Sequence, residues 1–135
     1  LEAGECVAIF PEGTITADPD GWPMTGRSGA ARLALTTGVP VIPVCQVGTE
    51  ALLGRKKLEF RRLFSLRRRP VMVQAGPPVD LSAFPVSEEP MREDVERASV
   101  AIMDAITAVV AELRGEPAPE GRWDMRVGTR VPQRG

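Results

Sequence analysis

Glu12 is the residue whose type and position could do chemistry in the first part of the chain. It lies in the sequence Phe-Pro-Glu-Gly-Thr at residues 10–14, directly after an apolar run at residues 6–10. A β-branched and aromatic run that stops at Pro-x-Gly is typical of a buried strand entering a turn. Ligands of open α/β sheets bind just beyond the carboxyl ends of strands. Glu12 could there act as a base, hold a metal or accept hydrogen bonds from substrate hydroxyls; a solvated loop glutamate is the alternative.

Arg27 is a second candidate, because it stands just ahead of an expected helix at residues 29–37 with Ser28 as the N-cap. Backbone amides at a helix N-terminus, the helix dipole and a guanidinium together can bind an anion. An exposed arginine beside a helix cap explains the same pattern. The turn-rich residues 15–27 that lead to it form a long connection, and such loops are usually functional or mobile.

Several kinds of chemistry are excluded by what the chain lacks. It contains no histidine, and its 2 cysteines, Cys6 and Cys45, are far apart and outside any Cys-x-x-Cys spacing. Neither a disulfide framework nor a zinc site is therefore expected, and a nucleophilic triad cannot be assembled. If these residues alone form an enzyme, carboxylates must do all the proton transfer; otherwise the base lies upstream.

The elements that must position these groups alternate between strands and helices. We expect strands at residues 6–10, 39–47 and 71–75, and helices at residues 29–37 and about 90–114. A strand, a short helix and a strand form a right-handed βαβ unit with parallel strands. The prediction is an α/β fold with a mostly parallel sheet flanked by helices. Pro40 and Pro43 are unusual inside a strand, which favours a strand start and a bulge or edge.

The two ends of the chain differ in pattern. Residues 1–5 resemble the last turn of a helix without a beginning, which predicts that the N-terminal part of the domain is missing. The expected final helix has apolar residues at three- and four-residue steps and stops at Gly115. Residues 115–135 have no periodicity, so we predict a domain at residues 1–114 and a flexible or loosely docked tail that contacts it through Trp123.

A basic segment at residues 55–69 stands out from a chain whose net charge is only −1. Its charge density predicts an anionic partner, with Arg67, Arg68 and Arg69 as membrane or anion contacts. An anionic membrane surface, a phosphorylated substrate or acidic carrier, nucleic acid and a solvated loop are all compatible with it. No apolar run approaches the length of a membrane span, so peripheral attachment is the form of membrane contact that we expect.

The residues also resemble a known family, the glycerolipid acyltransferases typified by 1-acyl-sn-glycerol-3-phosphate acyltransferase. Phe-Pro-Glu-Gly-Thr at residues 10–14 is similar to the third conserved block of that family, and Val-Pro-Val-Ile-Pro-Val at residues 39–44 is similar to the fourth. The segment at residues 26–34 resembles the basic-x-Gly-Ala stretch between the two blocks. The resemblance covers about residues 1–114 and is strongest at residues 4–47.

The resemblance implies transfer of a fatty acyl group from acyl-CoA or acyl carrier protein to a hydroxyl of a lysophospholipid or glycerol phosphate, in phospholipid biosynthesis at the cytoplasmic face of the membrane. It implies that Glu12 binds acceptor hydroxyls, that Gly13 and Thr14 shape the turn, and that Pro43 lines the acyl side. It implies no metal and no cofactor, since the thioester is a co-substrate. Nucleic acid is not a partner under this hypothesis.

Two departures from the family pattern matter. Ile15 and Thr16 stand where the family often has Arg-Ser, and we expect Arg27 to supply the missing charge. The family's His-x-x-x-x-Asp base is also absent, so no catalytic residue is expected in this fragment, which alone should be inactive. The alternative hypothesis is a non-catalytic basic module that binds anionic membrane lipid or nucleic acid through residues 55–69.

Overall fold

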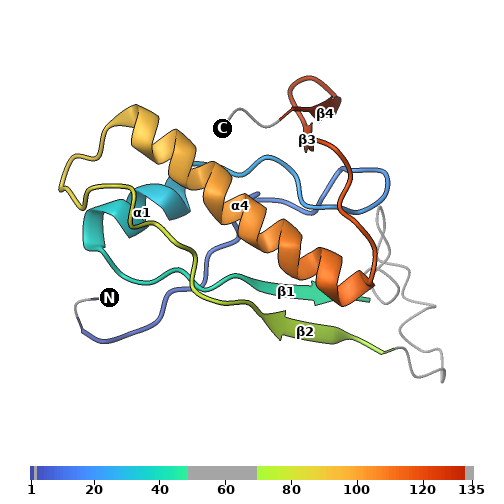
Figure 1. Cartoon of the computed structure of the whole chain (residues 1–135), viewed down its shortest axis with the longest axis horizontal. Coiled ribbons are helices and arrows are strands. Elements are labelled where there is room, and N and C mark those ends of the chain that lie inside the picture. Colours follow the sequence, from blue (N-terminus) through green and yellow to red (C-terminus); the bar gives the residue numbers. More distant parts are fainter. Residues whose placement is uncertain (2, 49–69, 133–135) are drawn as a thin grey trace.

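The computed structural model describes residues 1, 3–48 and 70–132. Two helices and two small antiparallel sheets make up its regular structure, arranged as in Figure 1. In chain order the elements are α1 (Gly29–Thr37), β1 (Val44–Val47), β2 (Met72–Ala75), α4 (Arg92–Arg114), β3 (Arg122–Asp124) and β4 (Thr129–Val131).

Both predicted helices are confirmed, and their apolar faces form the core. α1 ends at Gly38, which adopts a left-handed conformation, and α4 ends in the same way at Gly115. α4 begins at Arg92, so Pro90 lies just outside the helix instead of in its first turn. The larger core cluster consists of buried apolar side chains of α1 and α4: Ala31, Leu35, Val95, Ala98 and Ile102. The helical periodicity in the sequence therefore identifies this face correctly.

β1 and β2 form a two-stranded antiparallel sheet that α4 crosses on one face (Figure 1). The predicted strand at residues 39–47 is shorter than expected because proline cannot donate to a ladder. The extended chain nevertheless continues beside its partner through carbonyl acceptors. The Gly76 N–H donates to the Pro43 oxygen at 2.8 Å, and the Val79 N–H donates to the Val41 oxygen at 2.9 Å.

The predicted mostly parallel sheet is wrong. β1 pairs with β2 antiparallel, and β3 pairs with β4 antiparallel. Residues 6–10 belong to no strand, and Val7, Ile9 and Phe10 are exposed. An apolar run shows that a segment can be buried in a sheet, but a ladder also needs a neighbouring strand. Within the described ranges, no strand pairs with residues 6–10.

The outer face of the β1–β2 sheet is open, whereas α4 covers the inner face. Val44 and Val73 are 60% and 65% exposed, while Cys45, between them on the opposite side of the pleat, is 6% exposed. Successive side chains of a strand point to opposite faces, so the two faces differ as the pattern requires. None of the described helices is long and apolar enough to cross a membrane.

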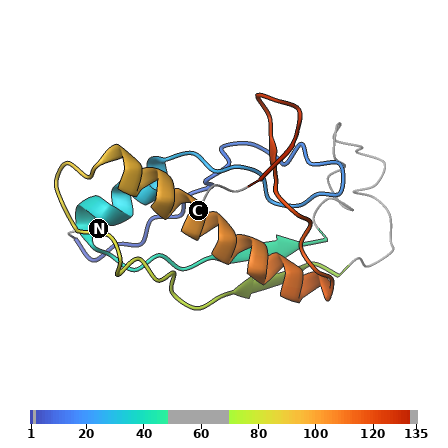
Figure 2. The ribbon, with the colours of Figure 1, turned by 45° about the horizontal axis from the view of Figure 1, so that its top comes forward.

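The C-terminal segment, for which the sequence shows no periodicity, contains the hairpin of β3 and β4. Figure 2 shows this hairpin standing beside the loop formed by residues 15–25. A parallel bridge joins Met24 to Trp123, and the Thr25 N–H donates to the Trp123 oxygen at 3.0 Å. The strands are too short to produce a visible alternation in sequence. The division of the chain at residue 114 stays a prediction.

Candidate functional site

The turn that carries Glu12 is closed by backbone hydrogen bonds on both sides. The Gly13 N–H donates to the Phe10 oxygen at 3.0 Å, and Gly13 has a φ of 68°, which favours glycine. The Arg27 N–H donates to the Pro11 oxygen at 2.7 Å. The Arg27 side chain then lies over Gly13, because a Cβ at Gly13 would be 3.1 Å from the Arg27 Nε. Two segments that are separate in sequence thus meet at this turn.

Gly26 brings this turn close to α4. A Cβ at Gly26 would lie 2.8 Å from the Met103 sulfur and 3.8 Å from the Pro11 Cβ. A larger residue would have to displace the Met103 side chain. The small residue therefore lets the turn pack against the helix, and the carboxylate of Glu12 is held near the protein interior.

The Glu12 carboxyl group is partly buried. Burial raises the pKa of the carboxyl above its ordinary value, and a hydrogen bond from the Met24 backbone and the charge of Arg122 oppose that rise. Burial and then the negative charge of Glu12 raise the pKa of the Cys45 thiol. The charge of Glu12 thus affects a thiol of β1, and the charge of Arg122 of β3 affects Glu12.

Arg122 is a buried cation that the sequence analysis did not identify. It is 5% exposed, forms an ion pair with Asp104 of α4, and its Nε donates to the Thr107 Oγ1 at 3.4 Å. Burial lowers the pKa of its guanidinium, and the charges of Asp104 and Glu12 oppose this effect. An arginine stays charged in proteins despite such a shift. Arg122 therefore places a fixed positive charge against α4.

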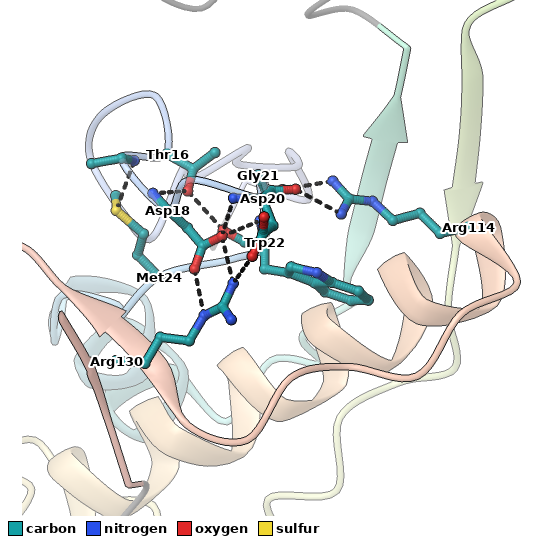
Figure 3. Close-up of polar contacts among 9 residues, drawn as sticks. Thr16, Asp18, Asp20, Gly21, Trp22, Met24, Arg114 and Arg130 are labelled. Atoms are coloured by element: carbon teal, nitrogen blue, oxygen red, sulfur yellow. Dashed lines mark hydrogen bonds and ion pairs between the residues drawn. The ribbon is translucent and has the colours of Figure 1, made fainter.

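A second cluster forms around Asp18 in the loop before α1, as Figure 3 shows. Asp18 is 2% exposed, and Arg130 of β4 binds both of its oxygens, at 2.8 and 2.9 Å. The Asp20 N–H and the Trp22 N–H also donate to Asp18, at 2.8 and 3.3 Å. Bidentate arginine–carboxylate pairs are among the stronger polar contacts in proteins. This loop is therefore fixed to the hairpin by directed bonds.

Arg114, the last residue of α4, holds the same loop from the opposite side. It donates to the Asp20 oxygen at 3.1 Å and to the Gly21 oxygen at 2.7 Å, and its guanidinium lies 4.7 Å from the ring centre of Trp22. Trp22 itself is 6% exposed and belongs to the second core cluster. The hydrogen bonds and the cation–π contact of Arg114 thus attach the loop to α4 beside the apolar core.

The remaining predicted site residues lie in different surroundings. Thr14 is exposed beside the turn. Ser28 occupies the N-cap position of α1, but its side chain makes no capping hydrogen bond. Pro43 is buried, and its ring lies 3.0 Å from the position of a Cβ at Gly76, where Val109 of α4 also packs. The structure thus brings Arg27 and Gly13 together with Glu12, and it places Pro43 under α4.

The predictions for the basic segment and for metal binding can be compared only with the residues that the structure describes. Arg67, Arg68 and Arg69 lie outside the described residues, so their role as membrane or anion contacts stays a prediction. Within residues 1, 3–48 and 70–132, no group of three or more His, Cys, Asp or Glu side chains could hold a metal ion.

A weak sequence signal for the missed hairpin exists. Asp124 and Gly128 bound its loop: the Arg126 N–H donates to the Asp124 side chain, and the Gly128 N–H donates to the Asp124 oxygen, both at 2.8 Å. Asp at the start of a turn and Gly at its end are typical of hairpin loops. No comparable signal predicts that Arg122 is buried, since its partner Asp104 comes from another element.

Comparison with known proteins adds one finding. Residues 1–47 match the family model described as Acyltransferase. The match confirms the predicted resemblance and indicates acyl transfer as the general class of activity. It ends at Val47, so it includes the Glu12 turn, Arg27, α1 and β1 and leaves out the hairpin. Comparisons with curated proteins and with solved structures gave no match.

Proposed function

We propose that the protein transfers a fatty acyl group from a thioester of coenzyme A or acyl carrier protein to a hydroxyl of a lysophospholipid or glycerol phosphate. The acyltransferase match supports the reaction class, and the predicted substrate-binding residues all lie within it: Glu12, Gly13, Thr14, Arg27 and Pro43. The proposal also includes a glycerolipid acceptor and a peripheral location at the cytoplasmic face of a membrane.

The observation that carries the proposal is that Glu12 and Arg27 meet at one turn. Arg27 is exposed and lies over Gly13, the residue that follows Glu12. A carboxylate accepts hydrogen bonds from hydroxyls, and a guanidinium matches the geometry of phosphate. A glycerol phosphate carries both groups a few bonds apart. One turn can therefore recognise the hydroxyl and the phosphate of the same acceptor.

In this mechanism Glu12 binds and orients the acceptor and does not remove its proton. A general base then deprotonates the attacking hydroxyl, which adds to the thioester carbonyl and expels the thiolate. The chain has no histidine, so a histidine base would come from outside these 135 residues. The proposed reaction uses no metal and no bound prosthetic group.

The test is acyl transfer by the 135-residue chain and by a longer protein that includes the upstream coding sequence, each as the native form and as Glu12→Gln. We expect turnover only in the longer protein, and a loss of about 10- to 100-fold in kcat/KM for Glu12→Gln, which corresponds to one hydrogen bond to a charged group. Glu5→Gln, at an exposed position, is the matched control.

Two outcomes would contradict the proposal. Turnover by the 135-residue chain would show that no external base is needed. Full activity of Glu12→Gln in the longer protein would remove Glu12 from acceptor binding. Using lysophospholipid and glycerol 3-phosphate as separate acceptors identifies the preferred substrate class in the same experiment.

A further inference from the structure

A short connecting segment, residues 24–27, begins at the C-terminal hairpin. Met24 forms a parallel bridge with Trp123 of β3, and the Thr25 N–H donates to the Trp123 oxygen at 3.0 Å. The Met24 side chain is 1% exposed, and its sulfur accepts a hydrogen bond from the Ala17 N–H at 3.0 Å. A side chain this enclosed holds its own backbone in place. The start of the connecting segment is therefore fixed to β3 by backbone contacts and to the core by packing.

The connecting segment ends at the turn that carries the candidate carboxylate. The Arg27 N–H donates to the Pro11 oxygen at 2.7 Å, and Gly26 alone separates Arg27 from Thr25 in the sequence. A Cβ at Gly26 would lie 2.8 Å from a side chain of α4, so the helix closes the segment on that side. Two residues of chain span at most about 7 Å. A displacement of Thr25 is therefore passed on to Arg27.

The location of the Arg27 guanidinium depends on this backbone. Its Nε would be 3.1 Å from a Cβ at Gly13, so the side chain lies directly over the turn. Within residues 1, 3–48 and 70–132, no carboxylate forms an ion pair with Arg27, and its side chain is exposed. The guanidinium is therefore placed by the chain that carries it, and it can bind an anion.

The hairpin that holds the connecting segment is itself attached to two other elements. Arg122 of β3 forms an ion pair with Asp104 of α4. Arg130 of β4 binds both oxygens of Asp18, at 2.8 and 2.9 Å (Figure 3). β3 and β4 are also paired with each other in an antiparallel ladder. The hairpin is thus a fixed support for the connecting segment.

We propose that Trp123 of β3 is a positioning residue for Arg27, so that the C-terminal hairpin sets the place at which the phosphate of an acceptor is bound. This inference rests on the proposed function, in which Arg27 recognises that phosphate. The Trp123 carbonyl acts on Arg27 through Thr25 and not by contact with the substrate. The hairpin lies outside residues 1–47, which match the acyltransferase model. The chain thus adds a second segment, distant in sequence, to the matched one.

This arrangement predicts a selective effect on acceptor binding. A guanidinium binds phosphate through two parallel hydrogen bonds, which require a defined orientation of its planar fork. Loosening the connecting segment misplaces the fork of Arg27 and leaves its charge unchanged. The affinity for a phosphorylated acceptor should therefore fall, whereas the chemical step on the bound acceptor, which depends on the general base, should change less.

The first test removes the backbone donor that binds the Trp123 oxygen. Thr25→Pro lacks this N–H, whereas Thr25→Ala keeps it and is the matched control. The measurement is hydrogen exchange of the Arg27 amide, which is bonded to Pro11, in the 135-residue chain. Exchange should be about tenfold faster in Thr25→Pro, the effect of one lost hydrogen bond, and unchanged in Thr25→Ala. Equal Arg27 exchange in the two folded variants would overturn the inference.

A second pair of variants displaces β3 in case Thr25→Pro does not fold. Gly121 and Gly128 both have a positive φ, 73° and 72°. A Cβ at Gly121 would lie 2.6 Å from the Val131 oxygen, while a Cβ at Gly128 would meet no atom of the described residues within 4 Å. Gly121→Ala should therefore speed exchange of the Arg27 amide, and Gly128→Ala, which carries the same backbone strain, should not. Equal exchange in these two variants would contradict the proposal.

Kinetics of the longer protein shows whether the effect passes through Arg27. Thr25→Pro should raise the KM for glycerol 3-phosphate by about tenfold and lower kcat by less. In an Arg27→Ala background, the same change should add nothing to KM, because the group that it misplaces is gone. Additive effects of the two changes on KM would indicate a general loss of structure and would overturn the inference.

The two measurements separate this inference from the proposed function. Faster Arg27 exchange in Thr25→Pro, without any acyl transfer by the longer protein, would disprove the proposed function and support the link between Trp123 and Arg27. Acyl transfer with unchanged Arg27 exchange, or with additive effects on KM, would disprove the positioning role alone.

Discussion

Asp18 and Glu12 are two carboxylates close in sequence, and each is affected by an arginine of the same hairpin. Arg130 of β4 binds Asp18 through both oxygens, and the charge of Arg122 of β3 acts to lower the pKa of Glu12. Despite this parallel, their titrations shift in opposite directions. The pKa of Asp18 is lowered, while that of Glu12 is raised.

The difference lies in how completely each carboxylate is bound. Burial alone would raise the pKa of Asp18, but hydrogen bonds from Arg130 and from the Trp22 and Asp20 N–H groups outweigh that effect. At Glu12, burial outweighs the effects of a Met24 backbone hydrogen bond and of the Arg122 charge. Asp18 has both oxygens bound by Arg130 and stabilises the loop, whereas a carboxylate without such a bidentate partner keeps capacity for a ligand. The comparison separates a structural site from a candidate binding site.

The largest expected effect comes from replacing Asp18, the carboxylate of the structural site. Asp18→Asn removes the buried charge that Arg130 binds and leaves Arg130 paired with Asp20, so we expect a loss of about 3 kcal/mol in the free energy of unfolding. Urea denaturation measures it. Asp20→Asn is the matched control, because the Asp20 side chain is 66% exposed and should contribute less than about 1 kcal/mol. Equal losses would show that the loop is not organised around Asp18.

The sequence predicts the helices and the Glu12 turn well because both depend on local patterns. The three- and four-residue spacing from Val95 to Val109 identifies the buried face of α4, and Gly38 and Gly115 end the two helices as expected. Pro-x-Gly places Glu12 on a turn next to Arg27. These features depend on neighbours within a few residues, which a single sequence displays directly.

The sheet could not be predicted in the same way, because strand pairing depends on residues far apart in the chain. The apolar run at residues 6–10 suggests a strand but does not specify a neighbour, and the order strand, helix, strand led to a parallel arrangement that the structure contradicts. The contacts of Arg122 with Asp104 and of Arg130 with Asp18 are equally long-range. Their charges are visible in the sequence, but their partners are not.

A smaller effect, in the pH dependence of stability, tests the opposite shifts of the two carboxylates. The lowered pKa of Asp18 stabilises the fold above the ordinary value of 3.8, and this stabilisation is lost as the pH falls through the folded-state pKa. The contribution of Glu12 to folding stability depends on pH in the opposite direction. Its raised pKa means that its contribution is fully present below 4.5 and is lost as the pH rises through the folded-state pKa.

Urea denaturation of the native chain, Glu12→Gln and Asp18→Asn across a pH series resolves the two contributions. The stability difference between the native chain and Asp18→Asn should shrink toward acid. The difference between the native chain and Glu12→Gln should become less favourable to the native chain as the pH rises above 4.5. If the difference in unfolding free energy from the native chain changed with pH in the same way for both variants, the two carboxylates would be bound alike. The distinction between them would then fail.

The smallest effect concerns the arginine that holds the Asp18 loop from the helix. Arg114 donates to two backbone carbonyls and lies against Trp22, an arrangement that depends on the planar fork of the guanidinium. Arg114→Lys keeps the charge but loses one hydrogen bond and part of the ring contact, so we expect a loss of about 1 kcal/mol in unfolding free energy. Arg92→Lys is the control, because the Arg92 side chain is 91% exposed in a pair with Glu96, and it should not change stability measurably.

Because Arg114 contacts the loop on the side of Asp20 and Gly21, its replacement should also leave the Glu12 titration unchanged. A shift of that titration would show that the structural cluster and the candidate site move together.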